Sequence, residues 1–226
     1  FFHIKFSFKD SRKVGVAIYA NGYEDINKIF NSIGPYPDFI HVDIVDKTMN
    51  KNALDTNLSK LEVVKAYWPN HSIETHIMSK TPLALINENI LNFSDIIYVH
   101  YEIDKREEVI KKIKSKNKIP GIVLHSIYDY VDIESVIRGF EQILILSISN
   151  PGTSGQKFNE KSYELIKKIN SVKFRNEFTV CVDGGVKSNI INKFISEKVV
   201  SGSDVLNNEH PVKRIMMLQT VARYEK

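Results

Sequence analysis

The chain has 226 residues, of which 42% are hydrophobic and 26% are charged. These proportions exclude a disordered or fibrous chain and indicate a globular protein long enough to bury a substantial core. The net charge of +4 suits an anionic ligand, but a lysine-rich solvated surface explains it better. No apolar run approaches the roughly 18 to 20 residues that cross a bilayer, so we expect no membrane partner.

The single cysteine, Cys181, excludes an intrachain disulfide and favours a reducing, cytoplasmic compartment. Cys181 lies in the apolar run FTVCVD and is expected in the core. The N-terminal run FFHIKFSFKD is apolar but contains lysines and lacks a signal-peptide cleavage pattern. Because it begins without methionine, a longer polypeptide with a fused partner domain stays open. We expect residues 1–226 to form one domain.

Short β-branched runs alternate with helical patterns along the chain, which predicts repeated βα units. The expected strands are Val14–Ala20, Phe39–Ile44, Ser72–Ile77, Ile96–Val99, Ile119–Leu124, Ile143–Ser147, Phe178–Val182 and Lys198–Ser201. The expected helices are Tyr23–Ile33, Leu58–Tyr67, Leu83–Leu91, Arg106–Ile113, Val131–Phe140, Glu160–Ile169, Asn189–Ile195 and Val212–Ala222. Eight pairs favour a closed (β/α)8 TIM barrel over a doubly wound open sheet, which normally has fewer strands and more polar edges.

In such a barrel the active site lies at the C-terminal ends of the strands. Alternation places His41 and Asp43 on one face of the second strand, and it places His76 and Met78 together on the third. Asp183 ends the seventh strand. Two imidazoles and two carboxylates can therefore meet at one mouth, as a mixed site for zinc, iron(II), manganese or cobalt. Taken singly, each residue also suits a structural hydrogen bond or a turn.

Other strand ends carry glycine-containing turns that could approach an anion, because glycine lets backbone N–H groups come close. Loops after the seventh and eighth strands are the usual phosphate site of these barrels. His100 ends the fourth strand. It could support the metal ligands or face a substrate, and we weigh these roles against a purely structural one. The expected phosphate-binding residues are Gly152, Thr153, Ser154, Gly155, Gly184, Gly185, Gly202 and Ser203.

These segments resemble the ribulose-phosphate 3-epimerases. HVDIVD is similar to the family's HxDxxD strand, ETHIM to its second histidine segment, SISNPGTSGQKF to its phosphate-side loop, VDGGVKSNI to its acid-bearing strand end, and VSGSDVL to its final phosphate turn. The order and spacing agree over roughly residues 13 to 220.

The resemblance implies metal ligation by His41, Asp43, His76 and Asp183, with Asp43 and Asp183 as the acid/base pair. It implies that His76 and Met78 also face the substrate and that the glycine turns hold a phosphate. The implied activity is epimerisation at C3 of a small ketose phosphate through an enediolate, whose charge a divalent metal stabilises.

Several positions depart from the family's usual pattern. They are Ala17 in place of a first-strand serine, Val45 in place of a methionine, Lys47–Lys51 in place of a glycine and Val-Pro-Asn loop, His125–Ser126 in place of Asn-Pro, and Thr153–Ser154 in place of Phe-Gly. None is one of the four proposed ligands. We weigh a changed substrate, such as a tetrulose or hexulose phosphate read by His125 and Lys47, against neutral drift around ribulose 5-phosphate.

Two other classes compete with an epimerase. A barrel decarboxylase or aldolase would carry an Asp-x-Lys pair, but the stretch here is Asp43-Ile-Val45. A catalytically inactive phosphosugar-binding or accessory domain would tolerate loss of the ligands, and all four are retained. A nucleic-acid role is disfavoured because the basic residues Lys111, Lys112 and Lys114 share one helix and suit a solvated face. The sequence leaves a homo-oligomer open.

Overall fold

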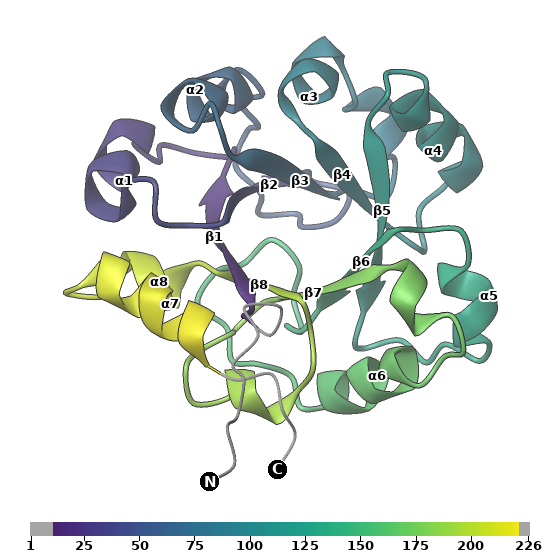
Figure 1. The fold of residues 1–226 in the computed structure, drawn as a ribbon. Helices are drawn as coiled ribbons and strands as arrows, with labels where there is room; N and C mark the ends of the chain where they lie inside the picture. The colour runs from purple at the N-terminus through teal and green to yellow at the C-terminus, as the bar shows by residue number, and fades with distance from the viewer. Residues whose placement is uncertain (1–10, 222–226) are drawn as a thin grey trace, which may run out of the picture.

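The computed structural model describes residues 11–221, which form one closed barrel of parallel strands in chain order (Figure 1). The strands are β1 Lys13–Tyr19, β2 Phe39–Val45, β3 Ser72–Met78, β4 Ile96–His100, β5 Ile119–His125, β6 Gln142–Leu146, β7 Thr179–Asp183 and β8 Lys198–Ser201. The helices are α1 Ile26–Ile33, α2 Lys60–Tyr67, α3 Glu88–Phe93, α4 Arg106–Lys114, α5 Ile133–Ile137, α6 Lys161–Asn170, α7 Ser203–Leu206 and α8 Pro211–Thr220. The prediction of a (β/α)8 barrel is confirmed.

The strands read as apolar runs because both of their faces are buried. Outward residues such as Ile40, Val42 and Ile44 belong to the large core between the barrel and its helices. Inward residues such as Cys181 and Leu144 form a smaller core inside the barrel. Cys181 is fully buried, as expected. The alternation that separates these two layers also turns selected polar side chains into the barrel.

A charged network fills the barrel interior near the strand beginnings. Lys198, the first residue of β8, donates to the Glu74 carboxylate of β3, and the Tyr98 hydroxyl donates to the same carboxylate over 3.2 Å. The Lys198 ammonium also lies 4.6 Å from the centroid of the Phe39 ring. Glu74 and Lys198 are both buried, so the pair is shielded from water and mutually satisfied. These side chains therefore close the barrel interior above the hollow at the strand beginnings.

Two expected helices differ most in the structure. The segment Leu83–Leu91 is divided into the 3₁₀ turn Pro82–Ala84 (η2) and α3, which the Asn87 side chain caps by accepting from Ile90 N–H. Only the 3₁₀ turn Ile191–Lys193 (η4) forms within Asn189–Ile195.

The buried Arg12 guanidinium contacts the segment that does not form the second helix. It donates to the carbonyls of Ile191, Phe194 and Ser196, and of these the Ile191 carbonyl is the one that a helix over Asn189–Ile195 would pair with the N–H four residues on. The short helix α7, which follows β8 directly, was not expected from the sequence.

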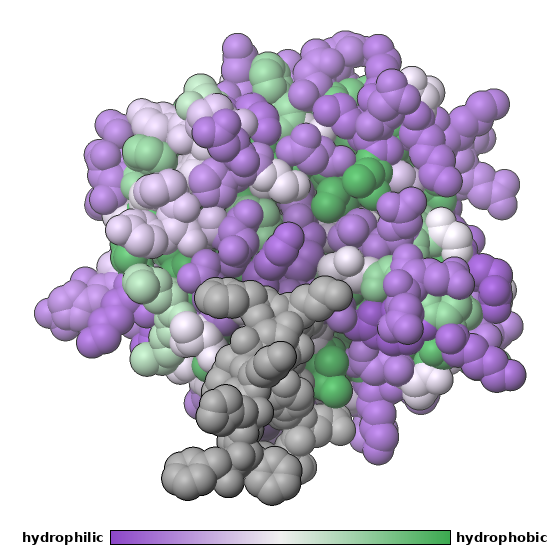
Figure 2. Space-filling model, in the orientation of Figure 1, coloured by the Kyte–Doolittle hydropathy of each residue, from purple (hydrophilic) through white to green (hydrophobic). Residues whose placement is uncertain are grey.

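Two expectations fall partly or wholly outside the described residues, namely the N-terminal run 1–10 and the last helical residue, Ala222. Within residues 11–221, none of the helices has the length and apolar character needed to span a membrane. Polar residues dominate the face of the molecule seen in Figure 2, with apolar side chains scattered among them. The barrel core thus lies beneath a largely hydrophilic exterior on that face.

Candidate metal centre and substrate cavity

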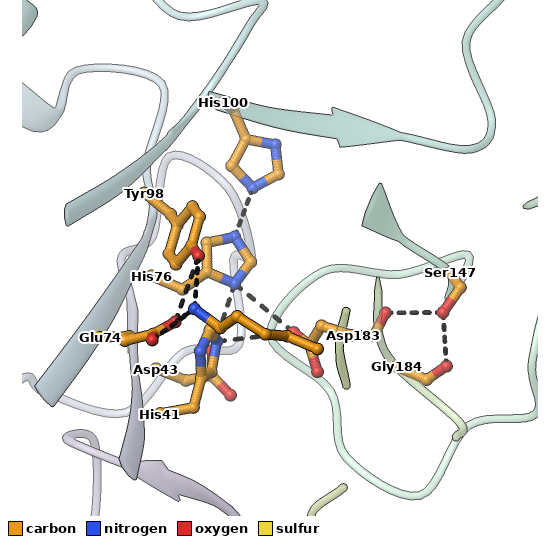
Figure 3. A network of polar contacts seen from close by, with 10 residues as sticks. His41, Asp43, Glu74, His76, Tyr98, His100, Ser147, Asp183 and Gly184 are labelled. Atoms are coloured by element: carbon orange, nitrogen blue, oxygen red, sulfur yellow. Dashed lines mark hydrogen bonds and ion pairs between the residues drawn. The ribbon is translucent and has the colours of Figure 1, made fainter. Parts of the chain in front are cut away.

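Four side chains from three strands meet at the C-terminal end of the barrel (Figure 3). His41 Nε2 lies 3.3 Å from Asp43 Oδ1 and 3.7 Å from Asp183 Oδ2. His76 Nδ1 lies at the same two distances from the same oxygens. One donor atom from each residue falls within 4.8 Å of the other three. The sequence expectation of convergence therefore agrees with the geometry.

Strand register explains the meeting. Asp43 of β2 pairs directly with His76 of β3, and His41 precedes Asp43 by one inward position. Asp183 is the last residue of β7, and its carbonyl accepts from both the amide N–H and the hydroxyl of Ser147 over 2.7 Å. The backbone that carries Asp183 is thus fixed to the end of β6. The side chain is aimed by strand geometry rather than by a flexible loop.

The cluster leaves buried polar atoms without hydrogen-bond partners among the described residues. They are His41 Nδ1, His41 Nε2, Asp43 Oδ1 and His76 Nδ1. A buried donor or acceptor without a partner costs roughly 1–3 kcal/mol. Three of these atoms face the centre of the cluster, where a cation would take their lone pairs. Two imidazole nitrogens and two carboxylate oxygens suit Zn²⁺, Fe²⁺, Mn²⁺ or Co²⁺, so the cluster could bind a divalent metal.

Asp43 and His76 shift each other's pKa values in opposite directions. Burial raises the pKa of Asp43, but the charges of His41 and His76 and their contacts outweigh burial and hold it at about 2. Burial lowers the pKa of His76, but the Asp183 and Asp43 carboxylates outweigh burial and raise it to about 9. In the free protein, therefore, Asp43 is ionised and a proton on His76 occupies the position open to a metal.

His100 lies behind the cluster rather than in front of it. Its Nε2 is 3.0 Å from His76 Nε2, and its Nδ1 is 3.1 Å from Glu102 Oε1. Burial lowers the pKa of His100 to about 4, although the contact with Glu102 opposes the shift. His100 is thus a neutral, fully buried imidazole at neutral pH. Of the roles weighed from the sequence, the geometry favours a supporting one.

A cavity opens directly over the two aspartates. Met78, Asp43 and Asp183 line it, whereas His41 and His76 lie beneath it with no exposed surface. All of the turns expected to hold a phosphate line the same cavity, through Gly152, Thr153, Ser154, Gly155, Gly184, Gly185, Gly202 and Ser203. Segments far apart in the sequence therefore build one wall of a single site.

Two of these glycines are required by their surroundings. Gly152 has a φ of 75°, and a Cβ there would lie 2.4 Å from Val45 Cγ1. Gly185 has a φ of 65°, and a Cβ there would lie 2.4 Å from the backbone nitrogen of Phe158. Both positions combine a left-handed backbone with close packing, which excludes other residues. The turns after β6 and β7 are consequently locked against their neighbours.

Tyr19 and Glu24 are among the lining residues that were not singled out from the sequence. Tyr19 follows Ala17 by two positions on the same strand, and Glu24 follows in the loop after β1. Glu24 Oε2 accepts from the Tyr19 backbone N–H over 2.8 Å. The Tyr19 hydroxyl has no hydrogen-bond partner among the residues that the structure describes. The alternation that placed Ala17 at the site could have indicated Tyr19, whereas no local signal marks Glu24.

Two residues that the sequence suggested for substrate recognition lie elsewhere. Lys47 forms an exposed ion pair with Asp55, with 3.3 Å between Nζ and Oδ1. His125 is buried, and its Nε2 lies 2.7 Å from the carbonyl oxygen of Ile148. Neither side chain lines the cavity over the aspartates. The departures at these positions therefore do not alter the wall of that cavity directly.

The fold and the site together define a barrel enzyme class with a buried His/Asp cluster that could bind a metal beneath an open cavity. A family model described as "Ribulose-phosphate 3 epimerase family" matches residues 14–206, and the chain belongs to this family.

Two relatives agree with this assignment, and a solved structure agrees with the fold. The ribulose-phosphate 3-epimerase of Helicobacter pylori is 28% identical over 196 residues, covering 81% of this chain and 86% of the relative. That of Encephalitozoon cuniculi is 27% identical over 154 residues and covers 68% of each chain. A crystal structure of KGPDC from Streptococcus mutans superposes with a TM-score of 0.64 at 14% identity, covering 92% of this chain and 95% of the other. The last likeness shows the fold alone.

Proposed function

We propose that this chain is a metal-dependent epimerase that inverts C3 of a small ketose phosphate. The observation that carries the proposal is that Asp43 and Asp183 contact the same pair of imidazoles and both line the cavity. Inversion at a carbon needs one group to remove a proton from one face and a second group to deliver a proton to the other. Two carboxylates from different strands suit these two tasks, with one removing the proton and the other delivering it.

A divalent cation held by His41, Asp43, His76 and Asp183 would stabilise the negative charge that develops on the substrate oxygens as the C3 proton leaves. In the free protein, contacts with His41 and His76 hold the pKa of Asp43 at about 2, and a bound cation would likewise keep it low, so Asp43 is a weak base. Proton removal by such a group depends on lowering the acidity gap through stabilisation of the enediolate, not on raising the basicity of the carboxylate. The two imidazoles would serve this chemistry by holding the cation between the two carboxylates.

The phosphate of the substrate would lie against the glycine turns after β6, β7 and β8. The left-handed glycines Gly152 and Gly185 allow the chain to pass close to a ligand, and the Thr153, Ser154 and Ser203 hydroxyls can donate to phosphate oxygens. Binding the non-reacting phosphate fixes the position of C3 between the aspartates, which lowers the entropic part of the barrier.

The sugar chain would extend towards the wall formed by Ala17, Tyr19 and Glu24. Burial and the Asp43 and Asp183 carboxylates raise the pKa of Tyr19 well above its usual value, so its hydroxyl is a neutral donor. This hydroxyl is available where the family's strand serine is absent. Ribulose 5-phosphate and its four- and six-carbon analogues are the candidate substrates. They would differ in their contacts with the wall that contains Tyr19.

The proposal is tested by following exchange of the substrate C3 proton in deuterium oxide by NMR, with each candidate sugar under identical metal loading. We expect C3 exchange and formation of the epimer with at least one ketose phosphate. Stoichiometric metal binding without any C3 exchange would instead identify an inactive phosphosugar-binding domain. Rates equal or higher with ribulose 5-phosphate would remove the case for an altered substrate.

A further inference from the structure

The two ring nitrogens of His76 face different partners. Nδ1 points to the Asp43 and Asp183 carboxylates, and Nε2 lies 3.0 Å from His100 Nε2 (Figure 3). Both rings are fully buried, and the angle between their planes is 20°. Two buried nitrogens at this separation can share one hydrogen bond. Since such a bond joins two nitrogens, only one of them can carry the shared hydrogen.

The contact between His100 and Glu102 indicates which of the two nitrogens carries the shared hydrogen. His100 Nδ1 lies 3.1 Å from Glu102 Oε1, and an ionised carboxylate can only accept a hydrogen bond. His100 Nδ1 therefore carries a hydrogen. His76 Nδ1 faces the cluster, and offering its lone pair to a cation leaves the hydrogen of His76 on Nε2. His100 Nε2 then accepts from His76 Nε2–H, which agrees with a hydrogen on His100 Nδ1.

We propose that His100 and Glu102 are positioning residues that set the tautomer, the ring orientation and the basicity of His76 as a metal ligand. The inference rests on the proposed metal site. A ligand imidazole that donates its second N–H towards a carboxylate binds metal more tightly, because the partner stabilises the charge drawn from the ring. Here the carboxylate acts through an intervening imidazole rather than directly.

The other imidazole of the cluster has no such support. His41 Nδ1 has no hydrogen-bond partner among the described residues, so no carboxylate or imidazole there accepts from it. The two histidines of the cluster are therefore unequal. His76 is the oriented and more basic ligand, and loss of the Glu102 charge should weaken this ligand specifically.

The experiment measures metal affinity rather than turnover. Zn²⁺ and Co²⁺ affinities are determined by chelator competition for the wild type, His100→Phe, Glu102→Ala and Glu102→Gln, together with the visible absorption of bound Co²⁺. We expect His100→Phe and Glu102→Ala to bind metal about 10- to 100-fold more weakly, with a shifted Co²⁺ spectrum. Glu102→Gln keeps an acceptor without the charge and should lie between them and the wild type.

Thr75→Val is the matched control. Thr75 lies on β3 beside His76, and its hydroxyl is 2.6 Å from Ser94 Oγ in an equally buried environment. Its removal deletes a buried hydrogen bond of the same strand without touching the cluster. We expect its metal affinity and Co²⁺ spectrum to match those of the wild type, so that a general loosening of β3 is told apart from loss of the His100 contact.

Glu102 keeps the test decisive if His100→Phe fails to fold, because the Glu102 side chain is 29% exposed and tolerates substitution better. Unchanged affinity and spectrum in folded Glu102→Ala would overturn the inference. An equal loss in Thr75→Val would overturn it as well. A wild-type protein that binds neither Zn²⁺ nor Co²⁺ would instead contradict the proposed function, so the two failures are distinguishable.

Discussion

Asp43 Oδ1 and Asp183 Oδ2 share the same two imidazole nitrogens, the first at 3.3 Å and the second at 3.7 Å. The two carboxylates come from β2 and β7, which the closed barrel separates by β1 and β8. A single centre thus gathers two acids from distant strands. Both carboxylates line the cavity above this centre.

The first prediction concerns these carboxylates. Asp43→Asn and Asp183→Asn should each lower epimerisation at least about 100-fold, since general acid–base groups contribute roughly 10²–10⁴. Turnover of the best substrate from the NMR assay is the measurement, with circular dichroism to show that the fold persists. Asp95→Asn is the control, because Asp95 accepts from Ile73 N–H at the other end of the barrel. Near-normal rates in either test variant would contradict the two-base assignment.

Metal removal gives the second prediction. A cation would satisfy buried atoms that are otherwise unpartnered, so chelation should lower the melting temperature and added Zn²⁺ or Mn²⁺ should restore it. A ligand at about 100 times its dissociation constant stabilises the folded state by about 2.7 kcal/mol. Calorimetry with and without chelator measures the shift. In His41→Gln the shift should shrink or vanish, and a shift as large as in the wild type would place the metal elsewhere.

The third prediction concerns the wall of the cavity. Tyr19→Phe removes a hydroxyl that has no partner among the described residues, so it should leave stability unchanged and raise KM for the preferred sugar phosphate. The loss of one hydrogen bond, worth about 1 kcal/mol, corresponds to about a 5-fold change. Steady-state kinetics with four-, five- and six-carbon substrates measure it.

Tyr23→Phe is the matched control for this wall, because Tyr23 lies in the neighbouring loop and is 99% exposed. Its KM should equal that of the wild type. If Tyr19→Phe and Tyr23→Phe behave alike with every substrate, the Tyr19 hydroxyl does not contact the sugar.

Glu24 gives the fourth prediction. Burial raises the pKa of the Glu24 carboxyl from its ordinary value of 4.5, although the Tyr19 N–H and Lys60 partly oppose the shift. A carboxyl with a raised folded-state pKa contributes stability below its unfolded pKa and loses that contribution as the pH rises through the folded value. At pH 7 the ionised Glu24 is therefore a cost to folding.

Glu24→Gln keeps an acceptor for the Tyr19 N–H but cannot ionise. We expect it to be more stable than the wild type at pH 7, with the difference closing as the pH falls below about 4.5. Urea unfolding at a series of pH values measures the difference. A variant less stable than the wild type at pH 7 would show that the Glu24 charge is favourable in place.

The barrel and the central cluster could be predicted because their signals are local. Runs such as Phe39–Val45 are mostly apolar and buried on both faces, and strand alternation alone places His41 and Asp43 on one side. Asp183 is marked by its position immediately before two glycines. Parallel strands bring such C-terminal ends together without further information.

The remaining features depend on contacts between distant residues. The segment Asn189–Ile195 has a helical pattern, but Arg12, from the beginning of the chain, takes its carbonyls. Likewise, the direction in which His125 points is decided by the carbonyl of Ile148. The placement of Glu24 follows from how the loop after β1 closes over the strand end. None of these partners is visible in a local pattern.

The buried pair of Lys198 and Glu74, with Tyr98 above it, blocks passage along the axis of the barrel from the strand beginnings. A substrate of the proposed reaction would therefore reach Asp43 and Asp183 through the cavity at the strand ends, and the product would leave by the same opening. Substrate and product would consequently occupy the same chamber in turn, so we expect the epimer to inhibit competitively.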